Sequence, residues 1–130
     1  WRYLDAPYRS ELSFYAVGRD EAPSHYLIAR YKEDEGQTAV RILDLWGDLN
    51  DQQAVRALIR RAVGDAASRG AVQVTVMITL PMLSAQFRSL GFLIPAKARF
   101  CWLSRSDSIM ARLGGTVYWT LGDSDADAPE

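Results

Sequence analysis

The sequence predicts an α/β domain of the α+β type, in which helices flank one sheet. Two observations lead to this fold class. Several short segments are rich in aromatic and β-branched residues and are apolar at every second position or throughout, which is typical of strands. In two other segments, apolar residues recur every three or four positions, which is typical of helices. In chain order, the predicted elements are three strands, a helix, a strand, a helix and two strands.

The first three strands are predicted at residues 13–17, 25–31 and 39–46. Gly18 and Pro23 lie between the first two segments and mark a turn, so these two strands are expected to form a hairpin. The third segment, AVRILDLW, is almost continuously apolar. This indicates a central position in the sheet, with both faces covered.

A long amphipathic helix is predicted from Ala54 to Gly70, because the apolar period changes from two to about 3.6 residues there. Its apolar face comprises Val55, Leu58, Ile59, Ala62 and Ala66. Asp48, Asn50 and Asp51 are candidates for the N-cap, since their short side chains can accept from the free N–H groups of the first turn. Gly70 is expected to end the helix.

The next segment, residues 71–80, alternates between apolar and polar residues and predicts a fourth strand. A shorter helix is expected to begin at Pro81 and to end at Gly91. Its apolar positions are Leu83, Phe87 and Leu90. The last two strands are predicted at residues 98–103 and 116–121.

The chain has 130 residues, of which 48% are hydrophobic, and this predicts one domain over residues 1–121 with an acidic tail at 122–130. No apolar run approaches the roughly 20 residues of a membrane span, so a soluble, cytoplasmic protein is expected. The arginines are spread along the chain and form no clustered basic face, so neither nucleic acid nor a membrane is an expected partner. Because the chain begins with Trp1, we expect it to be part of a longer protein.

The single cysteine and the acidic tail offer little chemistry. Cys101 excludes an internal disulfide and a cysteine-rich zinc site, and is interpreted as a small apolar strand residue. Ser124 lies in LGDSD, which is similar to the nucleophile block of the SGNH hydrolases, but the single histidine, His25, lies far upstream. Alternating carboxylates in the tail lack the glycine and the final carboxylate of a calcium loop, so no metal site is predicted; these residues are Asp123, Asp125 and Asp127.

The order of elements resembles the later part of the GNAT N-acetyltransferase fold, a mixed and mostly antiparallel sheet flanked by helices. LSAQFRSLGF (83–92) is similar to the family helix that reads approximately AxxxYxxxGF, and ALIRRAVGDAASRGA (57–71) to its long helix. The two chain ends, WRYLDAPY and VYWTLGDSD, are similar to those of a bacterial GNAT-related module that often forms the second half of a two-module chain. The resemblance implies acetyl-CoA or another acyl-CoA as the cofactor. It also implies an N-terminal GNAT-like module of the same chain, or a second copy, as the partner.

The start of the long helix departs from the family pattern. Family members that use acetyl-CoA carry RxxGxG or RxxGxA there, so that backbone N–H groups and the positive helix end hold the diphosphate. In this chain Asn50 replaces the Arg, and Gln53 and Val55 replace the glycines. These side chains are expected to keep a diphosphate from the backbone, while Asp48 and Asp51 add negative charge. The resemblance therefore implies a degenerate acyl-CoA site, whose contact residues would be Trp46, Gly47, Gln52, Gln53, Arg56 and Arg88.

Two further positions concern catalysis. Phe87 stands where the family often has a Tyr that protonates the leaving thiolate, and a phenyl ring has no proton to give. Asp44 lies in the strand where the family often has a Glu general base. A carboxylate there is costly to bury unless it is paired or faces a cleft, so Asp44 is either a general base or a salt-bridged or edge-exposed residue. Three aromatic residues are expected either to bind the acceptor substrate or to pack: Trp46, Tyr118 and Trp119.

Three functions remain open at this point. The leading hypothesis is the non-catalytic or acceptor-side C-terminal half of a longer N-acetyltransferase-type protein, with acyl-CoA binding supplied by the N-terminal module. An alternative is a self-sufficient N-acyltransferase that holds acyl-CoA by side chains such as Arg56 and Arg88. The third is a structural or dimerisation module.

Overall fold

The computed structural model describes residues 3–19, 22–78 and 80–93. The described residues fall into two compact units, with the boundary along the chain between Met77 and Ile78. Among the described residues, no helix is both long enough and apolar enough to span a bilayer. Several predicted features lie outside the described residues: the strands at 98–103 and 116–121, Cys101, and the tail with Asp123, Ser124, Asp125 and Asp127.

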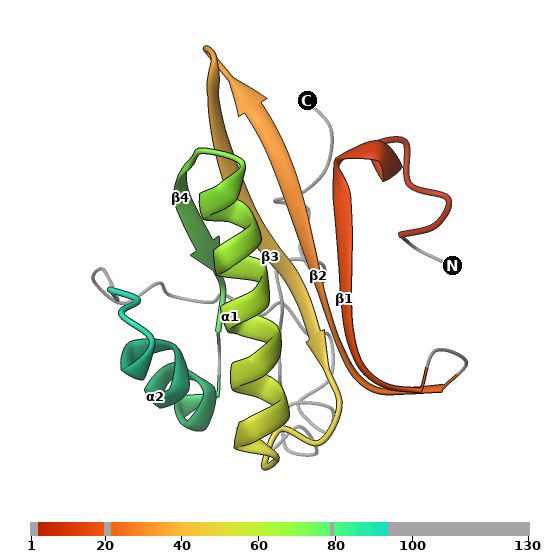
Figure 1. Cartoon of the computed structure of the whole chain (residues 1–130), viewed down its shortest axis with the longest axis vertical. Helices are drawn as coiled ribbons and strands as arrows, with labels where there is room; N and C mark the ends of the chain where they lie inside the picture. Colours follow the sequence, from red (N-terminus) through yellow and green to blue (C-terminus); the bar gives the residue numbers. More distant parts are fainter. Residues whose placement is uncertain (1–2, 20–21, 79, 94–130) are drawn as a thin grey trace, which may run out of the picture. The chain divides into compact units, whose positions relative to one another are not determined.

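The first unit is built on a four-stranded sheet with the order β1-β2-β3-β4 (Figure 1). The strands are β1 (Leu12–Arg19), β2 (Ala22–Asp34), β3 (Gln37–Trp46) and β4 (Ala71–Val76). β2 is antiparallel to both β1 and β3, whereas β4 is parallel to β3. The predicted hairpin and the central position of the third strand are confirmed. The hairpin strands are longer than predicted, because their pairing continues as far as Arg19 and Ala22.

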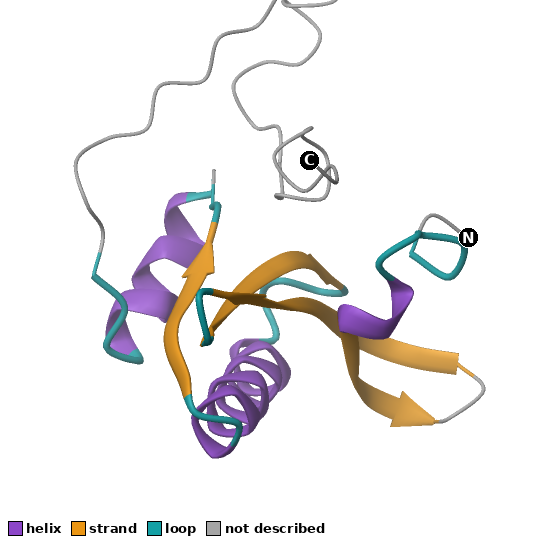
Figure 2. Ribbon diagram, turned by 90° about the horizontal axis from the view of Figure 1, so that it is seen from above, coloured by secondary structure: helices purple, strands orange, loops and turns teal. Residues whose placement is uncertain are grey.

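One face of this sheet is covered by α1 (Gln52–Ser68), which joins β3 to β4 and contacts β1, β2 and β4 (Figures 1 and 2). Its buried residues include the whole predicted apolar face: Ala54, Val55, Leu58, Ile59, Ala62 and Ala66. Asp51 is the N-cap. Gly70, with φ of 73°, follows the C-cap in the left-handed conformation that glycine adopts most readily. Both ends of this helix agree with the sequence prediction.

The opposite face of the sheet is partly covered by the N-terminal segment, which includes the short 3-10 helix η1 (Arg9–Glu11). Four apolar residues form a cluster there: Tyr3, Leu12, Ile28 and Leu43. The buried Arg30 donates from Nε to Glu11 Oε2 at 2.8 Å, and its guanidinium lies 4.0 Å from the centre of the Tyr8 ring. This ion pair and ring contact fasten the N-terminal segment to β2.

The central strand β3 has two irregularities near its end. Leu43 is an extra residue in the β2–β3 pairing, opposite the step from Ile28 to Ala29, and such a bulge bends a strand and redirects the side chains that follow. Pairing between β3 and β4 ends at Ile42, although β3 continues to Trp46. The parallel strands therefore stop pairing at their carboxyl ends, where open α/β sheets usually bind ligands.

The fourth strand is shorter than predicted and less buried. It ends at Val76 instead of residue 80, and Val72 on its expected apolar face is 61% exposed. Alternation in the sequence distinguishes the two faces of a strand but does not say how far along the strand a helix covers one of them.

The second unit contains α2 (Pro81–Ser89). Proline stands at its first position, and Gly91, with φ of 91°, lies just beyond its C-cap. Leu83, Gln86 and Phe87 are buried, and the Phe87 ring meets the Phe92 ring edge-on at 4.9 Å. The predicted helix and the packing role of Phe87 are confirmed.

Candidate functional site

An aromatic and acidic surface lies at the end of β3, on the face of the sheet opposite α1. Trp46 pairs with Tyr26 of β2, and their rings stack with centres 5.5 Å apart and planes inclined by 13°. The Tyr26 hydroxyl donates to Asp44 Oδ2 over a long 3.5 Å. Burial raises the pKa of Tyr26, and the nearby Asp44 carboxylate raises it further, so the phenol keeps its proton and acts as the donor. Trp46 is 55% exposed and gives this surface an accessible ring.

Asp44 and Trp46 stand two positions apart on β3 and lie on the same face of the sheet. Asp44 is half-buried and lies beside a tyrosine hydroxyl, an arrangement open to both of its predicted roles. Tyr26 was missed by sequence reasoning, because its place beside Trp46 depends on the register between β2 and β3. The other predicted aromatic residues, Tyr118 and Trp119, lie outside the described residues.

Gly47 follows this surface and has a conformational role. Its φ is 133°, and a Cβ added there would overlap the ring of His25. His25 is buried, and its Nε2 donates to the Asp48 carbonyl at 3.0 Å, since a carbonyl oxygen can only accept. Its Nδ1 lies 3.0 Å from the Ser24 hydroxyl. His25 is thus a strand residue that holds the loop between β3 and α1.

The start of α1 is capped by the chain's own carboxylates. Asp51 Oδ1 accepts from the Ala54 N–H at 3.1 Å. Asp48 Oδ1 accepts from the backbone N–H of Asn50 at 2.9 Å and from its side-chain amide at 3.1 Å. The Gln52 N–H donates to the Asn50 carbonyl at 2.8 Å. The N–H groups of Gln52 and Ala54, which a bound anion could use at this helix N-terminus, are therefore already engaged by internal acceptors.

The remaining residues predicted to contact acyl-CoA lie on two different helices. Gln52 and Gln53 are exposed in the first turn of α1. Val55 is fully buried, so its side chain belongs to the core and only Gln53 is left as the predicted steric obstacle. Arg56 has a buried Nε without a hydrogen-bond partner among the described residues. Arg88 is exposed in the last turn of α2, within the second unit.

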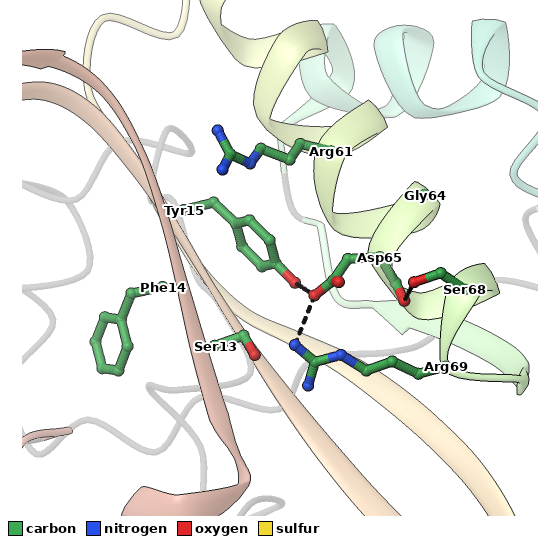
Figure 3. Close-up of a pocket in the computed structure, with 8 residues that line it drawn as sticks. All are labelled: Ser13, Phe14, Tyr15, Arg61, Gly64, Asp65, Ser68 and Arg69. Carbon is green, nitrogen blue, oxygen red and sulfur yellow. Dashed lines mark hydrogen bonds and ion pairs between the residues drawn. The ribbon is translucent and has the colours of Figure 1, made fainter.

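A second polar cluster lies between β1, β2 and the C-terminal half of α1 (Figure 3). Its centre is Asp65 Oδ2, which accepts from the Tyr15 hydroxyl at 2.7 Å and from the Tyr31 hydroxyl at 3.1 Å. Arg69 Nη2 forms an ion pair with the same oxygen at 2.9 Å, and its guanidinium lies 4.3 Å from the centre of the Tyr31 ring. The Tyr15 hydrogen bond, together with those from Tyr31 and Arg69, holds the pKa of the Asp65 carboxyl below its usual range. Burial raises the pKa of both tyrosines.

Sequence reasoning did not single out this cluster. Fifty positions separate Tyr15 from Asp65 in the sequence, and no local sequence pattern predicts a contact between residues so far apart in the chain. A partial signal was present in α1, where Arg61, Asp65 and Arg69 follow one another at spacings of four, which places them on one stripe of a helix.

We expect the Asp65 carboxylate to make folding more sensitive to acid. Its pKa is lower in the folded than in the unfolded chain, so its contribution to stability is present above the unfolded pKa and is lost as pH falls through the folded pKa. Denaturant unfolding between about pH 5 and pH 2 should show a larger loss of stability in the wild type than in Asp65→Asn. Parallel curves for the two proteins would contradict this expectation.

Neither protein-family models nor curated proteins match the chain. Solved structures do resemble it. An aminoglycoside acetyltransferase from an uncultured soil metagenomic sample, in complex with sisomicin, gives a TM-score of 0.62 at 14% identity, over 81% of this chain and 71% of that one. A probable acetyltransferase gives 0.57 at 18% identity, over 76% and 71%.

A ribosomal-protein-alanine N-acetyltransferase from Brucella melitensis gives a TM-score of 0.55 at 11% identity, over 73% of this chain and 72% of that one. These identities are low, and the likeness is one of fold. The mixed sheet, the helix that joins its parallel strands, and the loss of pairing at the end of those strands agree with it. The chain therefore has a GNAT-like fold, as the sequence resemblance predicted.

Proposed function

We propose that this domain is an acyltransferase-related GNAT-like module that does not bind acyl-CoA at the start of α1. In this proposal it forms the acceptor-side or packing half of a longer protein, and an N-terminal GNAT-like module with an intact RxxGxG pattern binds the coenzyme. The Asp51 cap on α1, together with the turn that Asp48 holds before the helix, is the observation that carries the proposal.

The capping argument has a geometric and an electrostatic part. A diphosphate at this position would have to displace the Asp51 carboxylate from the Ala54 N–H and compete with Asp48 for the preceding turn. The two carboxylates also repel an anion, by about 1 kcal/mol or less each at an exposed site. The lost backbone contacts are therefore the larger effect, and the exposed Gln53 side chain adds bulk where the family pattern has glycine.

The proposed binding surface for the substrate that accepts the acyl group consists of Tyr26, Asp44 and Trp46. Stacked aromatic rings beside a carboxylate suit a substrate that carries a cationic amine, because ring faces and carboxylates both attract positive charge. Two of the structural neighbours are described as an aminoglycoside acetyltransferase and a ribosomal-protein-alanine N-acetyltransferase. We therefore propose an amine as the class of acceptor.

Thermal denaturation with acetyl-CoA tests the first part of this proposal. A ligand at 100 times its Kd stabilises a protein by about 2.7 kcal/mol, which raises the Tm of a domain of this size by several degrees. We expect no such shift at about 1 mM acetyl-CoA, a concentration that would saturate a micromolar site. Isothermal titration that gave a micromolar Kd would refute the proposal.

The alternative of a self-sufficient N-acyltransferase is favoured by one observation. Arg56 lies one turn into α1, and its buried Nε has no hydrogen-bond partner among the described residues. If acetyl-CoA stabilised the wild type and Arg56→Ala abolished that effect, this alternative would replace the leading proposal. Arg60→Ala provides a matched control, since Arg60 is an exposed arginine on the same helix.

A further inference from the structure

A pocket of about 500 Å³ lies between β1 and the C-terminal half of α1 (Figure 3). This volume falls within the range of about 300–1,000 Å³ that is usual for small-molecule sites. It is separate from the start of α1, at the other end of that helix. The residues that line it are Ser13, Phe14, Tyr15, Arg61, Gly64, Asp65, Ser68 and Arg69.

The charges of the pocket leave one cation uncompensated. Asp65 and Arg69 neutralise each other through their 2.9 Å ion pair, and the two tyrosine hydroxyls donate to the same carboxylate oxygen. Arg61 extends from α1 toward Tyr15 in Figure 3 and has no hydrogen bond or ion pair within the part of the chain that the structure describes. The pocket therefore carries a net positive charge, centred on a free guanidinium.

Gly64 has no side chain, so the backbone of α1 is accessible at this part of the pocket wall. Of the glycines that the structure describes, all others have positive φ and are required by the backbone. Gly64 instead lies within α1, where glycine is, after proline, the poorest helix former. A Cβ added to it would meet no atom within 4 Å, so packing within this chain does not require a glycine at this position. An occupant of the pocket that approaches the helix backbone would require one.

We propose that this pocket binds a small molecule with a carboxylate or phosphate group, which pairs with Arg61. A guanidinium matches the two oxygens of such a group with parallel N–H donors, so Arg61 supplies both charge and orientation. The body of the ligand lies over the backbone at Gly64 and against the side of Tyr15. The Ser13 hydroxyl, half-buried on β1, is a further polar contact. This inference is independent of the function proposed for the start of α1.

Amide NMR titration at constant ionic strength tests the pocket, with sodium benzoate and inorganic phosphate as the two probes. We expect at least one probe to shift the amides of Ser13, Tyr15, Gly64 and Ser68 in a saturable manner, and the probe that binds more tightly identifies the anion class. Arg61→Gln should weaken binding at least tenfold. Arg60→Gln, the matched control on the same helix, should leave it unchanged.

Gly64→Ala distinguishes binding of the probe in the pocket from general attraction of an anion to a charged surface. Because nothing occupies the space above Gly64, the alanine should raise the Tm and, by narrowing the pocket, weaken binding of the probe at least fivefold. The proposal is overturned if neither probe shifts these amides up to about 50 mM, well beyond the Kd of a weak site. It is equally overturned if Arg60→Gln loses as much affinity as Arg61→Gln, or if Gly64→Ala binds like the wild type.

Discussion

Gly47→Ala is expected to lower the free energy of unfolding by about 3 kcal/mol or more. At φ of 133° the backbone of an alanine is strained, which lowers stability, and its Cβ would overlap the His25 ring. His25 cannot move away freely, because it is buried and its Nε2 is bonded to the Asp48 carbonyl. Urea denaturation of the two proteins measures the difference.

Two further variants divide this effect into its causes. Gly64→Ala is the control for glycine replacement in general and should raise stability by about 1 kcal/mol, since its surroundings are open. In a His25→Ala background the overlap with the ring is relieved, while the 2.8 Å approach to the Ser24 carbonyl oxygen and the backbone strain remain. Gly47→Ala should therefore cost about 1–2 kcal/mol less there. An equal cost in both backgrounds would show that the His25 ring is not the obstacle.

The elements of this fold that the sequence predicted are those with a local cause. The buried face of α1 follows from helical spacing, its start from the side-chain oxygen of Asp51, and its end from Gly70. The bulge at Leu43 was not predicted, because an extra residue in a nearly continuous apolar run leaves the pattern unchanged. It nevertheless decides which face of the sheet Asp44 and Trp46 share.

The residues of the candidate sites likewise fall into those that local sequence indicates and those that only contacts between elements bring together. Asp44 was singled out by its position in the family resemblance and Trp46 as an aromatic residue at the end of a predicted strand. Asp48, Asn50 and Asp51 were predicted as N-cap candidates, and the structure identifies Asp51 as the cap, whereas Asp48 accepts from Asn50 in the turn before the helix. The contact of Tyr15 with Asp65 joins residues from different elements, and sequence pattern carries no information about such pairing.

Asp65→Ala is expected to destabilise the protein by about 2–3 kcal/mol. The substitution removes the shared acceptor of two tyrosine hydroxyls. These hydroxyls lie 2.8 Å apart, so one can then donate to the other, and the remaining donor loses its partner. The loss of the Arg69 ion pair contributes less, because that pair is partly exposed. Arg69→Ala should therefore cost about 1 kcal/mol or less, and a cost equal to that of Asp65→Ala would assign the effect to the ion pair.

A double-mutant cycle with Tyr15→Phe isolates the hydrogen bond between β1 and α1. Tyr15→Phe alone should cost about 1 kcal/mol, since Asp65 keeps its bonds from Tyr31 and Arg69. In the Tyr15→Phe protein Asp65 accepts one hydrogen bond fewer, so Asp65→Ala should cost about 1 kcal/mol less than in the wild type. Strictly additive costs would mean that the 2.7 Å contact does not couple the strand to the helix.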